Sequence, residues 1–245
     1  MILGEVFNIL NEISPFELQE EWDNSGLILG AMSDEVKNIA IALDIDEEIL
    51  DNIAENTLII THHPLIFKKL NRLDYDLYPA KYIKKMIQKN ISHIAVHTSF
   101  DKTHLNMFVA QSILKLKNIT QKDFVCFGEI KEQTLEEFVE YVKKELGLLQ
   151  IKYTKANKTV KRVALTTGSG ASMLEYIDAD CFLTGDVKYH DAMLSNALGI
   201  SVVDITHYAS ERFFSTILCE KLKHNGIKAI IADSKDPFII MQEKK

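Results

Sequence analysis

Leu58-Ile59-Ile60-Thr61-His62-His63-Pro64 is an apolar run that ends in two adjacent histidines and a proline. A short run of β-branched and aliphatic residues predicts a buried strand, and Pro64 cannot continue its hydrogen-bond ladder. Both imidazoles are therefore expected where the strand ends. Because neighbouring strand residues point to opposite faces, the pair suits two metal ions side by side better than one ion bound twice. Two unrelated loop histidines would explain the pair if it stood alone.

Two further strand ends carry the same kinds of side chain. The run Ile94-Ala95-Val96 leads to His97-Thr98-Ser99-Phe100-Asp101, and the run Ile200 to Ile205 leads to His207-Tyr208-Ala209-Ser210-Glu211. In each, a carboxylate follows the histidine by four residues, a spacing that lets both side chains face one point at a helix start. Imidazole nitrogen and carboxylate oxygen are ligands that zinc, manganese and iron accept. The three clusters together predict a metal centre.

Length and composition limit the classes of protein to consider. The 245 residues allow one large α/β domain or two subdomains with a substantial core. The net charge of −7 argues against nucleic-acid and membrane partners, which require a basic surface. The first residues lack the basic start of a signal peptide, and no apolar run approaches the roughly 20 residues of a membrane helix. We expect a cytoplasmic protein.

The chain contains an internal repeat. The run Val36 to Leu43 resembles Val160 to Leu165, and each leads through helix, strand, helix and strand to the histidine and carboxylate pattern. The intervening elements are predicted at Glu47 to Ala54, Leu58 to Thr61 and Ala80 to Lys89, and at Ser172 to Ile177, Cys181 to Thr184 and Asp191 to Leu198. A duplicated βαβαβ-like unit predicts an α/β fold with two halves around a pseudo-twofold axis. We assign residues 1–125 to the first repeat, 126–158 to a connecting strand and helix segment, and 159–245 to the second repeat.

The two copies differ where the first has His62-His63, because the second has Gly185-Asp186. Two equal metal sites would need both copies intact, so we expect one site to which both copies contribute. Asp186 and His190 occupy the corresponding part of the second copy and are candidates for substrate contacts. A role at the start of a helix would explain Asp186 equally well.

Two helices are predicted outside the repeated elements. Thr134 and Glu137 form a capping box, which predicts a helix that ends at Gly147. The apolar stripe of the last helix, about Ser210 to His224, places Glu211 on its first turn.

Several loop residues have both a functional and a plain interpretation. The amides of Gly168-Ser169-Gly170 could bind phosphate, although a simple turn explains so short a loop. Lys68, Lys69 and Arg212 could hold a triphosphate, although exposed basic residues need no such role. Trp22 is expected in the core or in an interface and not as a base-stacking surface.

With these residues assembled, the sequence is similar to the type 2 GTP cyclohydrolase-like family, also called the NIF-three-like family. The similarity covers essentially the whole chain. It is carried by Glu21-Trp22-Asp23-Asn24-Ser25-Gly26-Leu27, His62-His63-Pro64-Leu65-Ile66-Phe67, His97-Thr98-Ser99-Phe100-Asp101, Gly168-Ser169-Gly170, Thr184-Gly185-Asp186 and His207-Tyr208-Ala209-Ser210-Glu211. Thr206 stands where a glycine is common in the family.

The resemblance implies two intertwined α/β halves with mixed sheets and a dinuclear metal site between them, assembled as a toroidal homohexamer. Two divalent ions of zinc, manganese or iron are implied as cofactors. By position, the implied metal ligands are His62, His63, Asp101, His207 and Glu211, with His97 close by.

The resemblance also implies a metal-dependent hydrolase that converts GTP to dihydroneopterin triphosphate and formate. We assign His97 a catalytic role as a proton shuttle, because imidazole side chains commonly transfer protons in catalysis near neutral pH. A direct ligand or an orienting residue is the alternative for His97. The alternatives for the whole protein are a metal-binding scaffold or regulatory protein without turnover, and a dinuclear phosphoesterase or amidohydrolase acting on another nucleotide.

Overall fold

The computed structural model describes residues 1–232 and 234–241, and the chain forms two compact units. Unit 1 consists of residues 1–103 with 213–235, and unit 2 consists of 104–212 with 236–245. The chain therefore leaves unit 1 and later returns to it. These boundaries differ from those of the predicted repeats, because the repeats follow sequence similarity and the units follow contacts in space.

Unit 1 is built on a five-stranded mixed sheet with the order β1-β4-β3-β2-β11. Strands β2, β3 and β4 are parallel, β1 is antiparallel to β4, and β11 is parallel to β2. Because the three parallel strands are in register at Ala42, Thr61 and Ala95, their carboxyl ends lie side by side. The strands are β1 (Gly26–Leu29), β2 (Asn38–Ala42), β3 (Thr57–Thr61), β4 (Ser92–Ala95) and β11 (Ile230–Ile231).

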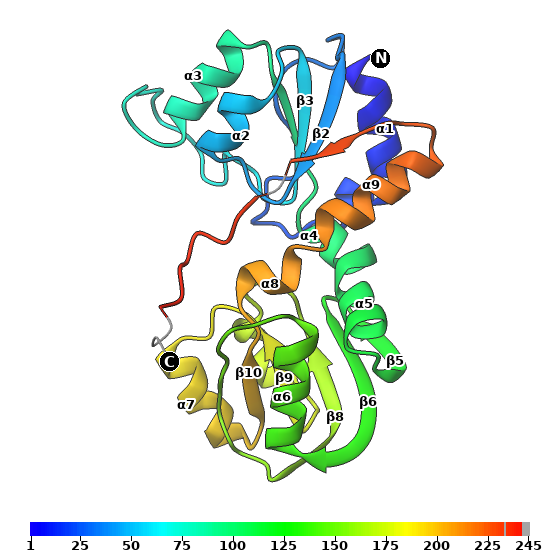
Figure 1. Ribbon diagram of the computed structural model, residues 1–245, viewed down its shortest axis with the longest axis vertical. Helices are drawn as coiled ribbons and strands as arrows, with labels where there is room; N and C mark the ends of the chain where they lie inside the picture. The colour runs from blue at the N-terminus through cyan, green and yellow to red at the C-terminus, as the bar shows by residue number, and fades with distance from the viewer. Residues whose placement is uncertain (233, 242–245) are drawn as a thin grey trace. The chain divides into compact units, whose positions relative to one another are not determined.

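Helices cover both faces of this sheet. Figure 1 shows α2 and α3 on one side of β2 and β3, with α1 and α9 on the other. Buried aliphatic side chains of α2, β3 and α3 form one core cluster, which includes Leu50, Ile59 and Ile83. The helical segments are α1 (Leu3–Ile13), η1 (Phe16–Leu18), α2 (Glu47–Asn52), α3 (Ala80–Gln88), α4 (Thr98–Phe100) and α9 (Phe214–His224).

Unit 2 is built on a six-stranded mixed sheet with the order β5-β6-β8-β9-β10-β7. Strands β8, β9 and β10 are parallel, as β2, β3 and β4 are in unit 1, and the other pairs are antiparallel. The α/β class with mixed sheets is confirmed. The strands are β5 (Lys117–Lys122), β6 (Val125–Thr134), β7 (Lys152–Tyr153), β8 (Thr159–Leu165), β9 (Cys181–Thr184) and β10 (Ser201–Asp204).

The helix predicted from the capping box of Thr134 is confirmed as α6 (Leu135–Glu145). The Thr134 amide donates to Glu137 at 3.0 Å, and the Glu137 amide donates to the Thr134 hydroxyl at 3.3 Å. Gly147 follows the helix with φ of +67°, a conformation that glycine adopts without strain. The remaining helical segments are η2 (Asp101–Leu105), α5 (Asn106–Phe108), η3 (Val109–Ile113), η4 (Ala171–Tyr176), α7 (Tyr189–Leu198) and α8 (His207–Glu211).

One prediction about local structure is wrong. The single helix predicted over Ser210 to His224 is divided into α8 and α9, which belong to different units. Glu211 is the last residue of α8 and does not lie on the first turn of α9. Of the two places expected for Trp22, the core is excluded, because 58% of its surface is exposed, and an interface stays a prediction.

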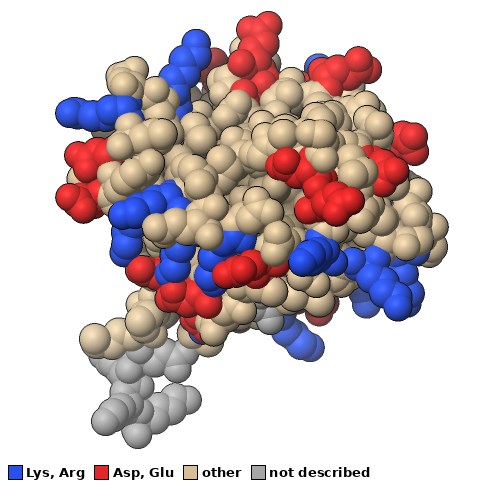
Figure 2. Space-filling view, turned by 90° about the horizontal axis from the view of Figure 1, so that it is seen from above, with Lys and Arg blue, Asp and Glu red and all other residues tan. Residues whose placement is uncertain are grey.

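None of the described helices is long and apolar enough to cross a membrane. On the face shown in Figure 2, basic and acidic side chains are interspersed among uncharged ones. That face carries no continuous basic surface.

Candidate metal centre

Three histidines of unit 1 lie together where β3 and β4 end. Thr61 pairs with Ala95, so the residues that follow the two strands are neighbours. One ring nitrogen each of His62, His63 and His97 lies within 4.8 Å of the others. Their ring centroids are 4.9 to 5.2 Å apart. The parallel register of the strands thus brings together histidines that are 34 and 35 positions apart in the sequence.

Asp101 adds a carboxylate to this group. Its Oδ1 atom lies 3.3 Å from Nε2 of His62, and both residues are buried. The spacing of four residues suggests that Asp101 faces His97, but the ion pair that the structure shows is with His62. We call His62, His63, His97 and Asp101 the unit 1 donor group.

Each histidine of this group is hydrogen-bonded through Nδ1, which leaves Nε2 as the atom that can bind a metal. Such contacts fix the orientation of the imidazole ring and select its tautomer. The contacts join His62 to the Val96 carbonyl at 3.1 Å, His63 to Asp44 at 2.9 Å and His97 to Asp23 at 2.8 Å.

Asp23 is a buried carboxylate with several donors around it. Burial by itself raises the pKa of Asp23, but hydrogen bonds and the charge of His97 outweigh it, so the pKa lies well below its ordinary value. The donors besides His97 are the Ser25 hydroxyl at 2.8 Å and the Thr98 hydroxyl at 2.7 Å. Asp23 is therefore an anion that holds the His97 ring in place.

Unit 2 contains a smaller donor group, made by His207 and Glu211. Nε2 of His207 lies 3.0 Å from Oε2 of Glu211, and its Nδ1 lies 2.8 Å from Oδ2 of Asp186. The predicted convergence across four residues is confirmed for this pair. Burial by itself lowers the pKa of His207, but Glu211 and Asp186 outweigh it and raise the pKa to about 9.

The interpretation of Asp186 as a residue at the start of a helix is wrong. The residue before the first turn of α7 is Lys188, and the carboxylate that caps it belongs to Asp191. Asp186 instead orients His207, as Asp44 and Asp23 orient the histidines of unit 1.

Two glycine positions make room for the unit 2 donors. A Cβ atom on Gly168, whose φ is +65°, would lie 2.2 Å from Oε1 of Glu211. A Cβ atom on Gly185 would lie 2.7 Å from the His207 amide nitrogen. The Gly185 position therefore admits no side chain while the backbone at His207 follows its present path.

The contacts of the Gly168-Ser169-Gly170 loop favour a simple turn over a phosphate site. The Gly168 amide donates to the Ser210 hydroxyl at 3.0 Å, and the Gly170 amide donates to the Thr184 hydroxyl at 2.7 Å. Two of the three amides of the loop are therefore already used within the protein.

The other candidate residues lie apart from these contacts or have structural partners. His190 is exposed on the first turn of α7, and none of its described contacts joins it to Asp186 or His207. Its role in substrate binding stays a prediction. Lys68 and Lys69 are exposed, whereas Arg212 donates to the Leu146 carbonyl at 3.2 Å near the end of α6.

Comparison with known proteins identifies the family. Residues 1–237 match the family model Duf34/NIF3 (NGG1p interacting factor 3). The chain belongs to the NIF3 family. A Campylobacter jejuni relative named GTP cyclohydrolase 1 type 2 homolog is 44% identical over 239 residues, covering 97% of this chain and 99% of the relative. A Helicobacter pylori relative named GTP cyclohydrolase 1 type 2 is 44% identical over 241 residues, covering 98% and 99%.

Two solved structures share the fold. The Staphylococcus aureus hypothetical protein SA1388 superposes with a TM-score of 0.85 at 27% identity, covering 98% of this chain and 99% of that one. Reduced HcgD from Methanocaldococcus jannaschii superposes with a TM-score of 0.82 at 27% identity, covering 95% and 97%. The family resemblance and the NIF3-like fold are confirmed.

A positive φ is the reason that glycine would suit the position of Thr206. Thr206 has φ of +58° and ψ of 151°, a region that L-residues other than glycine rarely adopt. The Thr206 hydroxyl accepts a hydrogen bond from the Ala209 amide at 3.3 Å and so caps α8.

The donors of both groups fit divalent transition metals. Imidazole nitrogen is a borderline ligand and carboxylate oxygen is a hard one, and zinc, manganese and iron accept both. Glu211 is 2% exposed and Asp101 is 8% exposed, and a carboxylate buried to this extent needs a cation beside it. The clusters can therefore hold metal ions.

Proposed function

We propose that this NIF3-family protein is a metal-dependent GTP cyclohydrolase that converts GTP to dihydroneopterin triphosphate and formate. The observation that carries the proposal is the unit 1 donor group. Its three oriented imidazoles and one buried carboxylate place atoms that can bind a metal close together. Identity of 44% across almost the full length of relatives with this name supports the choice of GTP.

We further propose that the donors of both units serve one centre with two divalent ions. The unit 2 group offers one imidazole and one carboxylate, fewer than the three protein ligands of a typical catalytic zinc site. His62, His63, Asp101, His207 and Glu211 are the ligands in this proposal, and His97 is a further candidate. When bound, such ions activate water for hydrolysis at neutral pH.

The contacts of His97 favour its alternative role as a metal ligand over a proton shuttle. Its Nδ1 atom is held by Asp23, so only Nε2 is available for chemistry. One ring nitrogen of His97 lies within 4.8 Å of ring nitrogens of His62 and His63. Asp23, Asp44 and Asp186 keep the rings of His97, His63 and His207 in fixed orientations.

A metal-binding regulatory protein without turnover is the second candidate. It is favoured by the description of the matched family as an NGG1p interacting factor, which refers to a protein partner. In that case the donor groups would stabilise the fold or a binding surface, and no nucleotide would be consumed.

The test is to incubate metal-loaded protein with GTP and with a panel of other nucleotides, and to measure formate and product mass. We expect formate from GTP and a product with the mass of dihydroneopterin triphosphate. His63→Ala and Asp101→Ala should abolish formate release, whereas Asp178→Asn, a change at an exposed carboxylate of unit 2, should not. Metal-loaded wild-type protein that releases no formate from GTP would contradict the proposal.

A further inference from the structure

Two exposed aromatic side chains lie beside the unit 1 donor group. The ring centroids of Trp22 and Phe67 are 5.9 Å apart, and those of Trp22 and His97 are also 5.9 Å apart. The ring centroids of Phe67 and His97 are 6.2 Å apart. Trp22 is 58% exposed and Phe67 is 45% exposed, so both rings have open surface next to a donor histidine.

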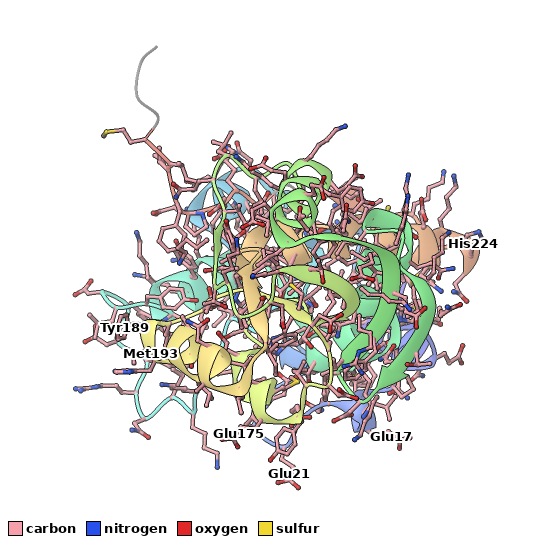
Figure 3. The ribbon with its side chains drawn as sticks, turned by 90° about the horizontal axis from the view of Figure 1, so that it is seen from below. Glu17, Glu21, Glu175, Tyr189, Met193 and His224 are labelled. Carbon is pink, nitrogen blue, oxygen red and sulfur yellow. The ribbon has the colours of Figure 1, made fainter. Side chains whose placement is uncertain are left out.

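This aromatic pair is held by specific contacts on both sides. Asp23, the residue after Trp22, is fixed by His97, Ser25 and Thr98. The Asn24 side-chain amide donates to the Ile66 carbonyl at 2.6 Å, which ties the Trp22 loop to the residue before Phe67. The loop itself lies at the surface, where Glu21 projects outward in Figure 3. The same network that orients His97 therefore also positions Trp22.

We propose that Trp22 and Phe67 form a stacking surface for the purine base of the substrate. The inference rests on the proposed function, because it assigns a part of that same site. Every base has a flat π-face that stacks on an aromatic side chain, and tryptophan offers the largest such area.

The position of the pair matches the part of the substrate that reacts. In GTP hydrolysis to formate the imidazole ring of guanine is opened, so the base and not the triphosphate must lie at the donor histidines. Lys68 and Lys69 follow Phe67 directly and are exposed, so their ammonium groups are available to phosphates. The sequence thus places aromatic surface nearest the donors and positive charge further along the same loop.

Tryptophan fluorescence tests the inference directly, because Trp22 is the only tryptophan of the chain. GTP, GDP, guanosine and inorganic triphosphate are titrated into metal-free and metal-loaded protein, with excitation at the red edge of tryptophan absorption, where guanine does not absorb. We expect saturable quenching by the three guanine compounds and none by inorganic triphosphate. Saturable quenching by inorganic triphosphate equal to that by GTP would overturn the assignment of a base site.

A second experiment compares the GTP affinity of variants by calorimetric titration. Trp22→Ala should weaken binding about 10-fold, in line with the cost of losing one base-stacking ring, and Trp22→Phe should restore most of it. Phe67→Ala should weaken binding in the same direction. Tyr176→Ala removes an exposed aromatic ring of unit 2, 78% exposed, and should change nothing.

The outcomes separate this inference from the proposed function. Quenching by guanine compounds without formate release would support the stacking surface and contradict the cyclohydrolase. Formate release with unchanged GTP affinity in Trp22→Ala would overturn the stacking surface alone. Loss of self-association in Trp22→Ala, with GTP affinity retained, would show that a second copy of the chain covers the ring and would also overturn it.

Discussion

Single carboxylates orient three of the donor histidines, namely His63, His97 and His207. Asp44 accepts a hydrogen bond from Nδ1 of His63 at 2.9 Å, and Asp186 accepts one from Nδ1 of His207 at 2.8 Å. A carboxylate in this position fixes the ring and increases the basicity of Nε2. The metal affinity of the protein should therefore depend on residues that do not touch the metal.

We expect Asp186→Ala and Asp44→Ala each to lower metal affinity about 10- to 100-fold, with smaller losses in the Asn variants, which retain an acceptor. The measurement is competition with a chromogenic chelator. Asp178→Asn should bind metal normally. Equal affinity in wild type and in both Ala variants would show that the two carboxylates do not support the ligands.

Gly168 should be essential for metal binding although it has no side chain. In Gly168→Ala the new Cβ would lie 2.2 Å from Oε1 of Glu211, so the carboxylate must move. The matched control is Gly199→Ala, where φ is +73° and no atom lies within 4 Å of the new Cβ. Both variants should lose about 1 kcal/mol or more of stability from the positive φ, measured by urea unfolding.

Only Gly168→Ala should also lose bound metal, measured by elemental analysis. Normal metal content in Gly168→Ala would mean that Glu211 can shift without consequence and would argue against its role as a ligand.

At the scale of elements, a buried histidine couples β4 to the turn after β3. Nε2 of His93 lies 2.7 Å from the Thr61 hydroxyl, and that hydroxyl donates to the His63 carbonyl at 2.6 Å. Because the single hydroxyl proton is used there, the His93 ring must donate through Nε2. Nδ1 of His93, which has no hydrogen-bond partner among the described residues, is then the unprotonated nitrogen.

This buried ring should make the fold sensitive to acid. Burial lowers the pKa of His93 from 6.5 to about 3. Between these values the unfolded chain binds a proton that the folded chain does not, so stability falls as the pH falls. We expect the free energy of unfolding of the metal-free wild type, measured with urea, to fall as the pH is lowered from ~6.5 to ~4. The fall should exceed that of His93→Gln by on the order of 1 kcal/mol per pH unit. Parallel pH profiles of the two proteins would contradict a neutral buried His93.

The sequence predicts the elements well where their signal is local. The strand that ends at His62 and the capping box of Thr134 depend on neighbouring residues, and both are found as predicted. The break at Arg212 and Phe213 was missed because the apolar stripe from Phe214 to Leu222 gives no indication of where the helix begins. A further turn, α8, precedes it in the other unit.

The pairings between side chains could be predicted only in part. Parallel strands bring their carboxyl ends together, so the meeting of His62 with His97 follows from the sequence. Asp44 follows the end of β2 and could have been found by the same reasoning. Asp23 could not, because it reaches His97 from a loop 74 positions earlier. The pairing of Asp101 with His62 likewise depends on how a helical turn is placed in space.

At the scale of the whole molecule, we propose that the chain assembles as a closed homo-oligomer, most simply a hexamer. Helix α7 carries large exposed hydrophobic side chains, and Figure 3 shows Tyr189 and Met193 on its outer side. Tyr189 is 74% exposed and Met193 is 55% exposed. Sedimentation at micromolar concentration should give the mass of six chains, and a monomer would contradict the proposal.

Metal content per chain tests the central proposal, that both donor groups hold metal. Wild type, His62→Ala and Glu211→Ala are stripped, reloaded with zinc, manganese or iron, freed of excess metal and analysed for bound metal and protein. We predict two ions per wild-type chain and a clear loss in both variants, with circular dichroism unchanged. Wild-type content in both variants would contradict the account, because neither donor group would then hold the metal.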